Sequence, residues 1–315
     1  RQSGLSHLMS LALGLLLLGA MSQSAIWPFQ RWLLSSLNSP TPVSAIMHAG
    51  LINGGGFLLV RFAPLYLQSP LLLTGLAVIG FLTAWLGTFW KLMQPDVKRM
   101  LACSTMGQMG FMFVQCGLGL FPAAVAHLVW HGLFKAYLFL SSGSAAQEKR
   151  IDLDYPPGLP AFFGSLLCGL IGSASFSLTS GETWFVGTTT LVLNAIVFLS
   201  GSQFALPLLR VQPLRMLPGA LLGTALAGLI YGSSVQLITG FMAPMALMQP
   251  QPLTIFHIAG LLVLSVSWIG MLFIRKPAKT GALPKWALKS YVLALNASQP
   301  HPTTITTHRN HYHYR

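Results

Sequence analysis

Residues 122–142 read PAAVAHLVWHGLFKAYLFLSS, and this segment decides the fold. It is about 20 residues long and mostly apolar, which is the length that an α-helix needs to cross a bilayer. Three ionisable side chains interrupt it at intervals of four residues: His127, His131 and Lys135. On a helix, this spacing places all three on one face over about 12 Å. The segment therefore predicts a transmembrane helix with a polar stripe.

The composition of the whole chain also indicates a membrane protein. The 315 residues are 53% hydrophobic and only 7% charged, with a mean hydropathy of +0.65. A soluble protein carries about 25% charged residues, so this chain has too few to cover a soluble surface. A net charge of +13 on a soluble domain would indicate nucleic acid binding, but here the basic residues lie between apolar segments and near the C-terminus. We predict a multi-pass membrane protein that contacts the lipid bilayer and binds no nucleic acid.

Nine apolar segments have about the length of a membrane span. They predict an all-α fold, a polytopic transmembrane helix bundle, because the strands of a β-barrel would alternate polar and apolar residues. Basic residues gather in every second loop and in the C-terminal tail, which the positive-inside rule assigns to the cytoplasm. The predicted spans are residues 4–22, 42–62, 70–91, 101–120, 122–142, 159–179, 185–208, 215–236 and 253–274.

Prolines interrupt the chain around the first two spans. Pro28 follows the end of the first span, and Pro40 and Pro42 precede the second. Proline removes a backbone donor and disrupts the preceding turn, and a break at membrane depth is tolerated only against protein or water. Transporters build ion sites at such broken helices. The alternative is an interfacial loop anchored by Trp27.

The polar stripe is the main candidate site. A lysine inside the bilayer costs at least about 2.5 kcal/mol, and no acidic residue lies near Lys135 in the sequence. Because a buried lysine can exchange its proton near neutral pH and histidine titrates there, we predict that His127, His131 and Lys135 form a proton pathway. His48, in the second span, is a weaker candidate. The alternatives are a structural stripe between helices, or a lysine whose amine reaches the interface.

The sequence indicates neither catalysis nor metal binding. No pair of nucleophile and base is apparent, so no catalytic residue is predicted and the chain is not expected to be an enzyme. The HxxxH pair of His127 and His131 lacks an acidic or cysteine partner, and alone it is a weak zinc signal.

Three ordered motifs resemble those of a known family. They are Trp27–Phe29 with Pro40–Ala49, then Asp96–Met106, then His127–Ala136. Together they resemble the proton-translocating antiporter-like subunits, which include the large membrane subunits (subunit L) of NADH-quinone oxidoreductase and of multisubunit cation/proton antiporters.

The resemblance implies a fold of two inverted five-helix repeats, each with a broken helix. It implies that His48, His127, His131 and Lys135 match the proton path of the family. The lysine of the first broken helix corresponds here to Gln23, and the second broken helix, at residues 162–180, offers only Ser and Thr.

The resemblance also divides the chain. Residues 1–62 would hold the last two helices of the first repeat, residues 63–209 the second repeat, residues 210–274 further transmembrane helices, and residues 275–315 a basic cytoplasmic tail. Because Arg1 runs directly into an apolar stretch, we expect that an N-terminal part is missing.

Within the family, this chain is most similar to the membrane subunit of DAB-type inorganic carbon pumps. The features that indicate this are the missing lysines and the ending at residues 295–310. This implies a subunit of the bacterial inner membrane that conducts protons or cations for CO2 or bicarbonate uptake. It implies no cofactor in this chain, and a peripheral cytoplasmic partner that resembles carbonic anhydrase and holds zinc. One alternative is a subunit of a respiratory oxidoreductase or a cation/proton antiporter, with other membrane subunits as partners. Another is a non-conducting anchor for a peripheral enzyme.

Overall fold

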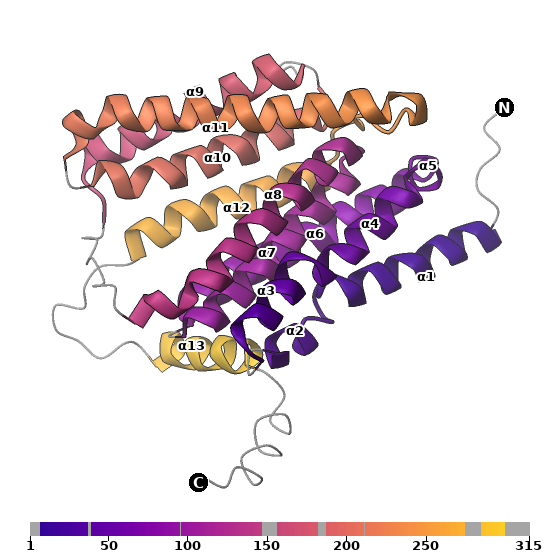
Figure 1. Cartoon of the computed structure of the whole chain (residues 1–315), viewed down its shortest axis with the longest axis horizontal. Coiled ribbons are helices and arrows are strands. Elements are labelled where there is room, and N and C mark those ends of the chain that lie inside the picture. The colour runs from indigo at the N-terminus through magenta and orange to yellow at the C-terminus, as the bar shows by residue number, and fades with distance from the viewer. Residues whose placement is uncertain are drawn as a thin grey trace, which may run out of the picture.

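The computed structural model describes residues 7–36, 39–94, 96–146, 156–181, 187–210, 212–274 and 285–299. Within these ranges the chain is helical, apart from turns and two isolated β-bridges, so the predicted all-α bundle is confirmed (Figure 1). The α-helices are α1 His7–Gln23, α2 Arg31–Ser35, α3 Thr41–Ala49, α4 Gly54–Arg61, α5 Ala63–Tyr66, α6 Pro70–Met93, α7 Val97–Gly117, α8 Phe121–Leu140, α9 Leu159–Ser180, α10 Thr190–Leu209, α11 Pro213–Met242, α12 Ile255–Ile274 and α13 Lys285–Ala297.

Each of the nine predicted spans is found as a helix, or as a pair of short helices. Seven stretches are long and apolar enough to cross a membrane: Thr41–Arg61, α6, α8, α9, α10, α11 and α12. α1 is shorter, at 17 residues. α7 has 21 residues but is less apolar, and most of its side chains are buried among other helices. A helix that contacts protein on most sides does not need a lipid-facing apolar surface.

Small residues bring α6, α7 and α8 close together. A Cβ on Gly87 of α6 would meet the backbone of Gly107 in α7, and a Cβ on Gly110 would lie 2.8 Å from the carbonyl of Gly80. α8 packs on α3 as well as on α7, and Gly132 permits this because its Cβ would come within 2.9 Å of the carbonyl of Ala49. Small residues allow such close approach between membrane helices.

The break after the first helix is confirmed. α1 ends at Gln23, and a turn that contains Pro28 leads to α2. The indole of Trp32 donates a hydrogen bond to the carbonyl of Ser22 at 2.9 Å, which satisfies one of the backbone groups that the helix end exposes.

The second span is irregular but not broken at its prolines. Pro40 caps α3 and Pro42 lies in its first turn, where proline is tolerated. The irregularity comes later, where a 3-10 turn at Leu51–Asn53 joins α3 to α4.

The second break, expected at residues 162–180, is not found. α9 runs without interruption from Leu159 to Ser180. Its proline, Pro160, lies in the first turn. The hydroxyls of Ser165 and Thr179 bond to carbonyls of the preceding turn, at 2.7 and 3.1 Å. Nothing in the segment therefore removes a backbone donor from the helix interior, and the resemblance was wrong on this point.

α9, α10 and α11 form a second group beside the α1–α8 bundle, and α12 contacts α6 and α10 (Figure 1). Backbone hydrogen bonds join the loops at one end of both groups: Gln249 donates to Gly119, and Thr189 donates to Gln251. Apart from Arg61 and the interior Lys135, the described basic residues lie toward the other end. They are Arg31, Lys91, Lys98, Arg99, Arg210, Arg215, Lys285 and Lys289. The division of the chain into repeats stays a prediction.

Candidate functional site

Lys135 is fully buried inside the bundle. α8 carries it five residues before the end of the helix at Leu140, and the side chain has no exposed surface. Its Nζ donates a hydrogen bond to the carbonyl of Leu101 on α7 at 3.2 Å. The amine therefore points into the protein and not to the surface of the bundle.

A hydrogen-bonded chain joins Lys135 to His48. The carbonyl of Leu101 also accepts from the hydroxyl of Thr105, at 3.0 Å, and Nδ1 of His48 lies 3.2 Å from that hydroxyl oxygen. The His48 ring stacks on Phe139 with centroids 4.3 Å apart. A hydroxyl has one proton, so if Thr105 donates it to Leu101, Nδ1 of His48 must be the donor and Nε2 is an acceptor.

The other two histidines extend this cluster along α8. The rings of His127 and His131 stack with centroids 6.1 Å apart. His131 is only 5% exposed, and neither of its ring nitrogens bonds to a side chain or backbone group of the described part of the chain. His131 is within electrostatic range of His127, Lys135 and His48. The structure thus brings together the four ionisable residues that the sequence singled out.

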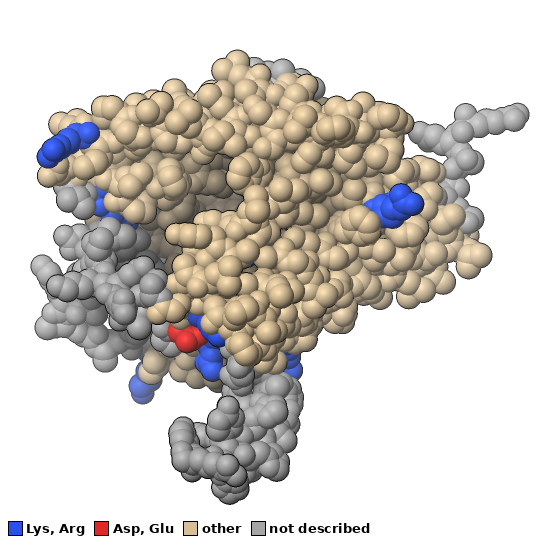
Figure 2. Space-filling view, viewed as in Figure 1, with Lys and Arg blue, Asp and Glu red and all other residues tan. Residues whose placement is uncertain are grey.

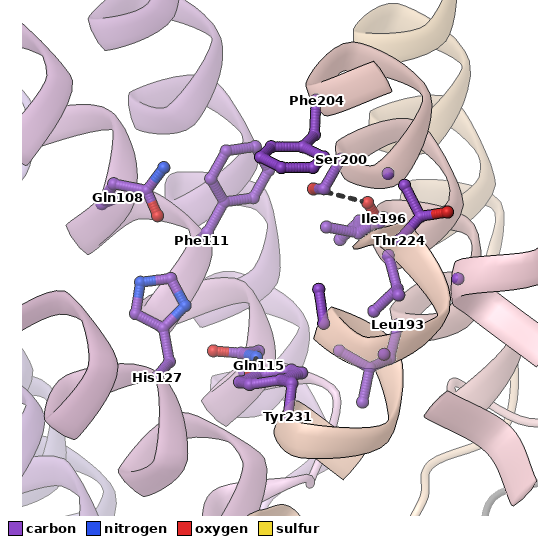
Figure 3. A pocket seen from close by; sticks show the side chains of 15 residues that line it. Gln108, Phe111, Gln115, His127, Leu193, Ile196, Ser200, Phe204, Thr224 and Tyr231 are labelled. Carbon is purple, nitrogen blue, oxygen red and sulfur yellow. Dashed lines mark hydrogen bonds between the residues drawn. The ribbon is translucent and has the colours of Figure 1, made fainter. Parts of the chain in front are cut away.

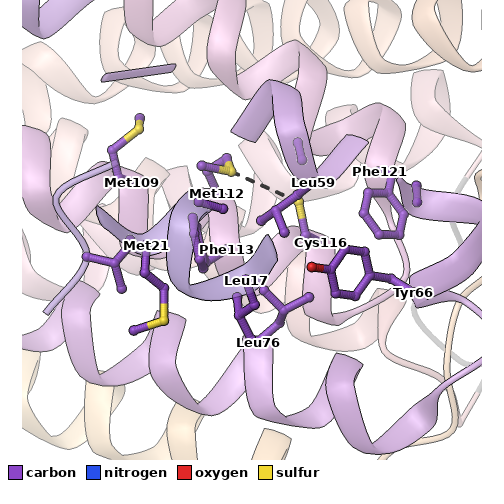
Figure 4. Close-up of a cluster of buried hydrophobic side chains, with 14 of the residues drawn as sticks. Leu17, Met21, Leu59, Tyr66, Leu76, Met109, Met112, Phe113, Cys116 and Phe121 are labelled. Carbon is purple, nitrogen blue, oxygen red and sulfur yellow. Dashed lines mark hydrogen bonds between the residues drawn. The ribbon is translucent and has the colours of Figure 1, made fainter. Parts of the chain in front are cut away.

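A cavity of about 330 Å³ adjoins this row on the side of the second helix group. His127 points toward it from α8, Gln108 and Gln115 from α7, and Tyr231 from α11 (Figure 3). Gln115 donates to the hydroxyl of Tyr231 at 3.0 Å. Oε1 of Gln115 and Nε2 of His127 are buried with no partner among the described residues. Most of the cavity wall is apolar, but water that binds beside these polar groups would find hydrogen-bond partners there.

No sequence pattern predicted this cavity. Gln108 and Gln115 lie in a predicted span in which the sequence singled out neither residue, and Tyr231 is more than 100 residues away from them in the chain. Only the docking of α11 beside α7 brings these residues together.

The residues at the predicted breaks have a different environment. Gln23, where the family is expected to place a lysine, donates to the carbonyl of Leu51 at 2.9 Å. It therefore ties the end of α1 to the 3-10 turn of the second span. Pro28, Pro40 and Pro42 lie in the turn before α2 and at the start of α3, and they offer no polar side chain.

The described residues contain no group of three or more His, Cys, Asp or Glu side chains that could hold a metal ion. The tail histidines, from His301 onward, lie outside the described residues.

Comparison with known proteins identifies the relatives. Residues 2–159, about half of the chain, match the family described as NADH:quinone oxidoreductase/Mrp antiporter, transmembrane. A protein of Halothiobacillus neapolitanus named probable inorganic carbon transporter subunit DabB1 is 43% identical over 194 residues, which cover 61% of this chain and 33% of that protein. From the same organism, probable inorganic carbon transporter subunit DabB2 is 31% identical over 288 residues, covering 90% of this chain and 52% of the relative.

A third relative comes from a plant. The chloroplastic NAD(P)H-quinone oxidoreductase subunit 5 of Brachypodium distachyon is 42% identical over 153 residues, which are 48% of this chain and 21% of that protein. This chain spans about half the length, or less, of these curated relatives.

Proposed function

The chain belongs to the NADH:quinone oxidoreductase/Mrp antiporter transmembrane family, and from that premise we propose that it is a proton- or cation-conducting subunit of an energy-coupled inorganic carbon uptake complex. The observation that carries conduction is the row formed by the buried side chains of Lys135, His48 and His131 and the partly buried His127. The carbon substrate is proposed because two relatives are named inorganic carbon transporter subunits.

In this proposal, Lys135 alternates between its charged and neutral forms during turnover. A charged amine at a buried site with only a carbonyl as partner is costly. The structure describes one acidic residue, Asp96, and its carboxylate caps α7 by accepting from the amide of Arg99. The charged form is therefore short-lived, and its proton passes to a neighbour.

The histidines are the neighbours that receive the proton. Imidazole accepts and releases protons near neutral pH, and His48, His131 and His127 each have at least one ring nitrogen without a partner among the described residues. The cavity beside His127 would supply water at the far end of the row from Lys135.

The partner in this proposal is a peripheral cytoplasmic subunit that resembles carbonic anhydrase and holds zinc. The relatives are subunits of larger assemblies by name, and the basic end of the bundle is the one that the positive-inside rule assigns to the cytoplasm.

A subunit of a respiratory complex or of a cation/proton antiporter is the second candidate. The match to the plant quinone oxidoreductase subunit favours it. Against it, Gln23 stands where the family is expected to carry a lysine, and its amide is bonded to the backbone of Leu51.

The deciding experiment uses the full-length protein in a host that lacks carbonic anhydrase. It is expressed together with the soluble protein that the neighbouring reading frame would encode. Lys135→Met should assemble at the parental yield, because methionine is a good helix former of similar length, but should not support growth in air. Lys98→Met is the matched control: Lys98 also donates to a carbonyl, that of Ser39 at 3.1 Å, but it lies at the start of α7, outside the row. If Lys135→Met assembles normally and grows like the parent, conduction through the row is wrong.

Two further measurements test the partner and the orientation. A co-purifying soluble zinc protein supports carbon uptake, whereas co-purifying membrane subunits support the second candidate. Truncation after Lys276, which lies outside the described residues, should lower the yield of the soluble partner. Reporters active on one side only should give the same signal after Gly143 and after Thr280, and opposite signals would overturn the topology.

A further inference from the structure

α13 lies across the basic end of the bundle, and we propose that it is a membrane-interface helix that binds anionic phospholipid headgroups. The helix spans Lys285–Ala297 and reads KWALKSYVLALNA. Figure 1 shows it beyond the ends of α6 and α7, with no other labelled helix outside it. This inference does not depend on conduction or on the carbon substrate.

Hydrogen bonds fix the C-terminal end of α13 at the membrane boundary. Gln94 donates to the hydroxyl of Ser298 at 2.7 Å, and the guanidinium of Arg99 donates to the side-chain oxygen of Gln299 at 2.6 Å. Gln94 and Arg99 lie on either side of the turn between α6 and α7, where the chain leaves one membrane-spanning helix and enters the next. Ala294 packs against a buried cluster at the same end. The depth of α13 is therefore set by the ends of α6 and α7.

The remaining surface of α13 has the pattern of an interfacial helix. At 100° per residue, Lys285, Lys289 and Asn296 fall on the side opposite Ala294 and Ser298, so the polar stripe faces away from the bundle. Apolar side chains lie along both edges of this stripe, and they are Trp286 (74% exposed), Leu293 (61%), Leu288 (51%) and Val292 (44%). Such helices place apolar side chains at the acyl boundary and lysines among the headgroups, and tryptophan is enriched at that depth.

The charge of this end favours anionic lipid. Figure 2 shows basic side chains at this end, close to acidic surface. Besides the two lysines of α13, the described basic residues at this end of α2, α6 and α7 are Arg31, Lys91, Lys98 and Arg99, whereas the described acidic residue is Asp96. Each basic residue near an anionic bilayer surface contributes favourably to its attraction. An acidic protein could match the charge, but it would also have to present apolar side chains to both edges of α13, whereas a lipid bilayer supplies charge and apolar surface together.

The depth of α13 can be measured in nanodiscs that contain the full-length protein without soluble partners. An environment-sensitive fluorophore is attached at Val292→Cys, on an apolar edge, and in a matched variant at Asn296→Cys, on the polar stripe. Lipids with a quencher close to the headgroup should quench the fluorophore at position 292 more strongly than the one at position 296. Equal, weak quenching at both positions would overturn the proposal.

The headgroup preference is measured by thermal unfolding in phosphatidylcholine nanodiscs with and without phosphatidylglycerol. Phosphatidylglycerol should raise the unfolding midpoint of the parent, because a ligand that binds the native state stabilises it. Lys285→Gln with Lys289→Gln should reduce this rise by about half, and the paired arginine variant should keep it. An unchanged rise in the glutamine variant would overturn headgroup binding by α13. Quenching that changes only when the soluble partner is added would assign the surface to an acidic protein instead.

Discussion

The α3–α7–α8 region and the α9–α11 group are both built from apolar helices, yet they bury different chemistry. The first buries Lys135, His48 and His131. The second has no His, Lys, Asp or Glu in its three helices, and its arginine, Arg215, is in the first turn of α11. Its buried polar side chains are neutral, and they are Ser165, Ser173, Ser180, Thr190, Asn194, Ser202 and Thr224.

The hydrogen bonding of the two regions differs accordingly. In the α9–α11 group, Ser173 donates to the carbonyl of Asn194 and Ser177 to its side-chain oxygen, both at 2.8 Å. Only the amide nitrogen of Asn194 is left buried without a described partner in this network. In the first region, by contrast, His48, His127 and His131 all have ring nitrogens without a partner in the described part of the chain. Neutral hydroxyls and amides hold helices together and do not titrate near neutral pH, whereas an imidazole with an open ring nitrogen is available for proton transfer.

Replacing Lys135 by arginine should have the largest effect on transport. The guanidinium keeps the positive charge but does not release its proton in the physiological range. Lys135→Arg should therefore reduce proton flux in proteoliposomes to the background level, although the charge is conserved. A flux close to that of the parent would mean that the site needs only a positive charge. Proton release by Lys135 would then not distinguish the α3–α7–α8 region from the α9–α11 group.

Removing one histidine should have a smaller effect. In His131→Ala, water can occupy the space of the ring and bridge the remaining groups, so proton flux should fall by several-fold and should not be abolished. The same proteoliposome assay checks this, with the yield of assembled protein measured in parallel. A loss as complete as that expected for Lys135→Arg would show that His131 is essential, contrary to the water-bridged row.

The hydroxyl of Thr105 should matter less again. Thr105→Val keeps the shape of the side chain but removes the link between His48 and the carbonyl of Leu101. One such hydrogen bond is worth about 0.5–1.5 kcal/mol. Because about 1.4 kcal/mol corresponds to a factor of ten, we expect a roughly two- to ten-fold loss of flux. Thr105→Ser restores the hydroxyl and should restore most of the flux. If serine fails as valine does, packing at this position explains the loss.

Much of this arrangement could be predicted from local patterns. The lengths of the apolar segments predict the helices, and the four-residue spacing of His127, His131 and Lys135 places them on one face whatever surrounds α8. The break after α1 follows from the proline at position 28. These features depend on residues within a few turns of one another.

The features that the sequence did not predict depend on distant parts of the chain. The hydrogen bonds that connect Lys135 to His48 need the backbone carbonyl of Leu101. A backbone group cannot be recognised from the type of the residue that carries it. The cavity needs Tyr231 to reach Gln115. α13 lies in a tail that is polar overall, and its place is fixed by Gln94 and Arg99. The break expected in α9 came from the resemblance, and no residue there enforces it.

The smallest effect on transport should come from the α9–α11 group itself. Asn194 is fully buried, and its side-chain oxygen accepts from Ser177. Asn194→Ala would leave that hydroxyl without its partner and should lower the free energy of unfolding by roughly 1 kcal/mol, as polar contacts between membrane helices are worth about this much or less. Ser177→Ala is the matched control, because it removes the same hydrogen bond from the other side. Both variants should unfold at a lower temperature in nanodiscs, while the proton flux per assembled protein stays at the parental level, since neither residue lies in the ionisable row. A drop in flux at unchanged stability would place the α9–α11 group in the conduction path and would break the comparison between the two regions.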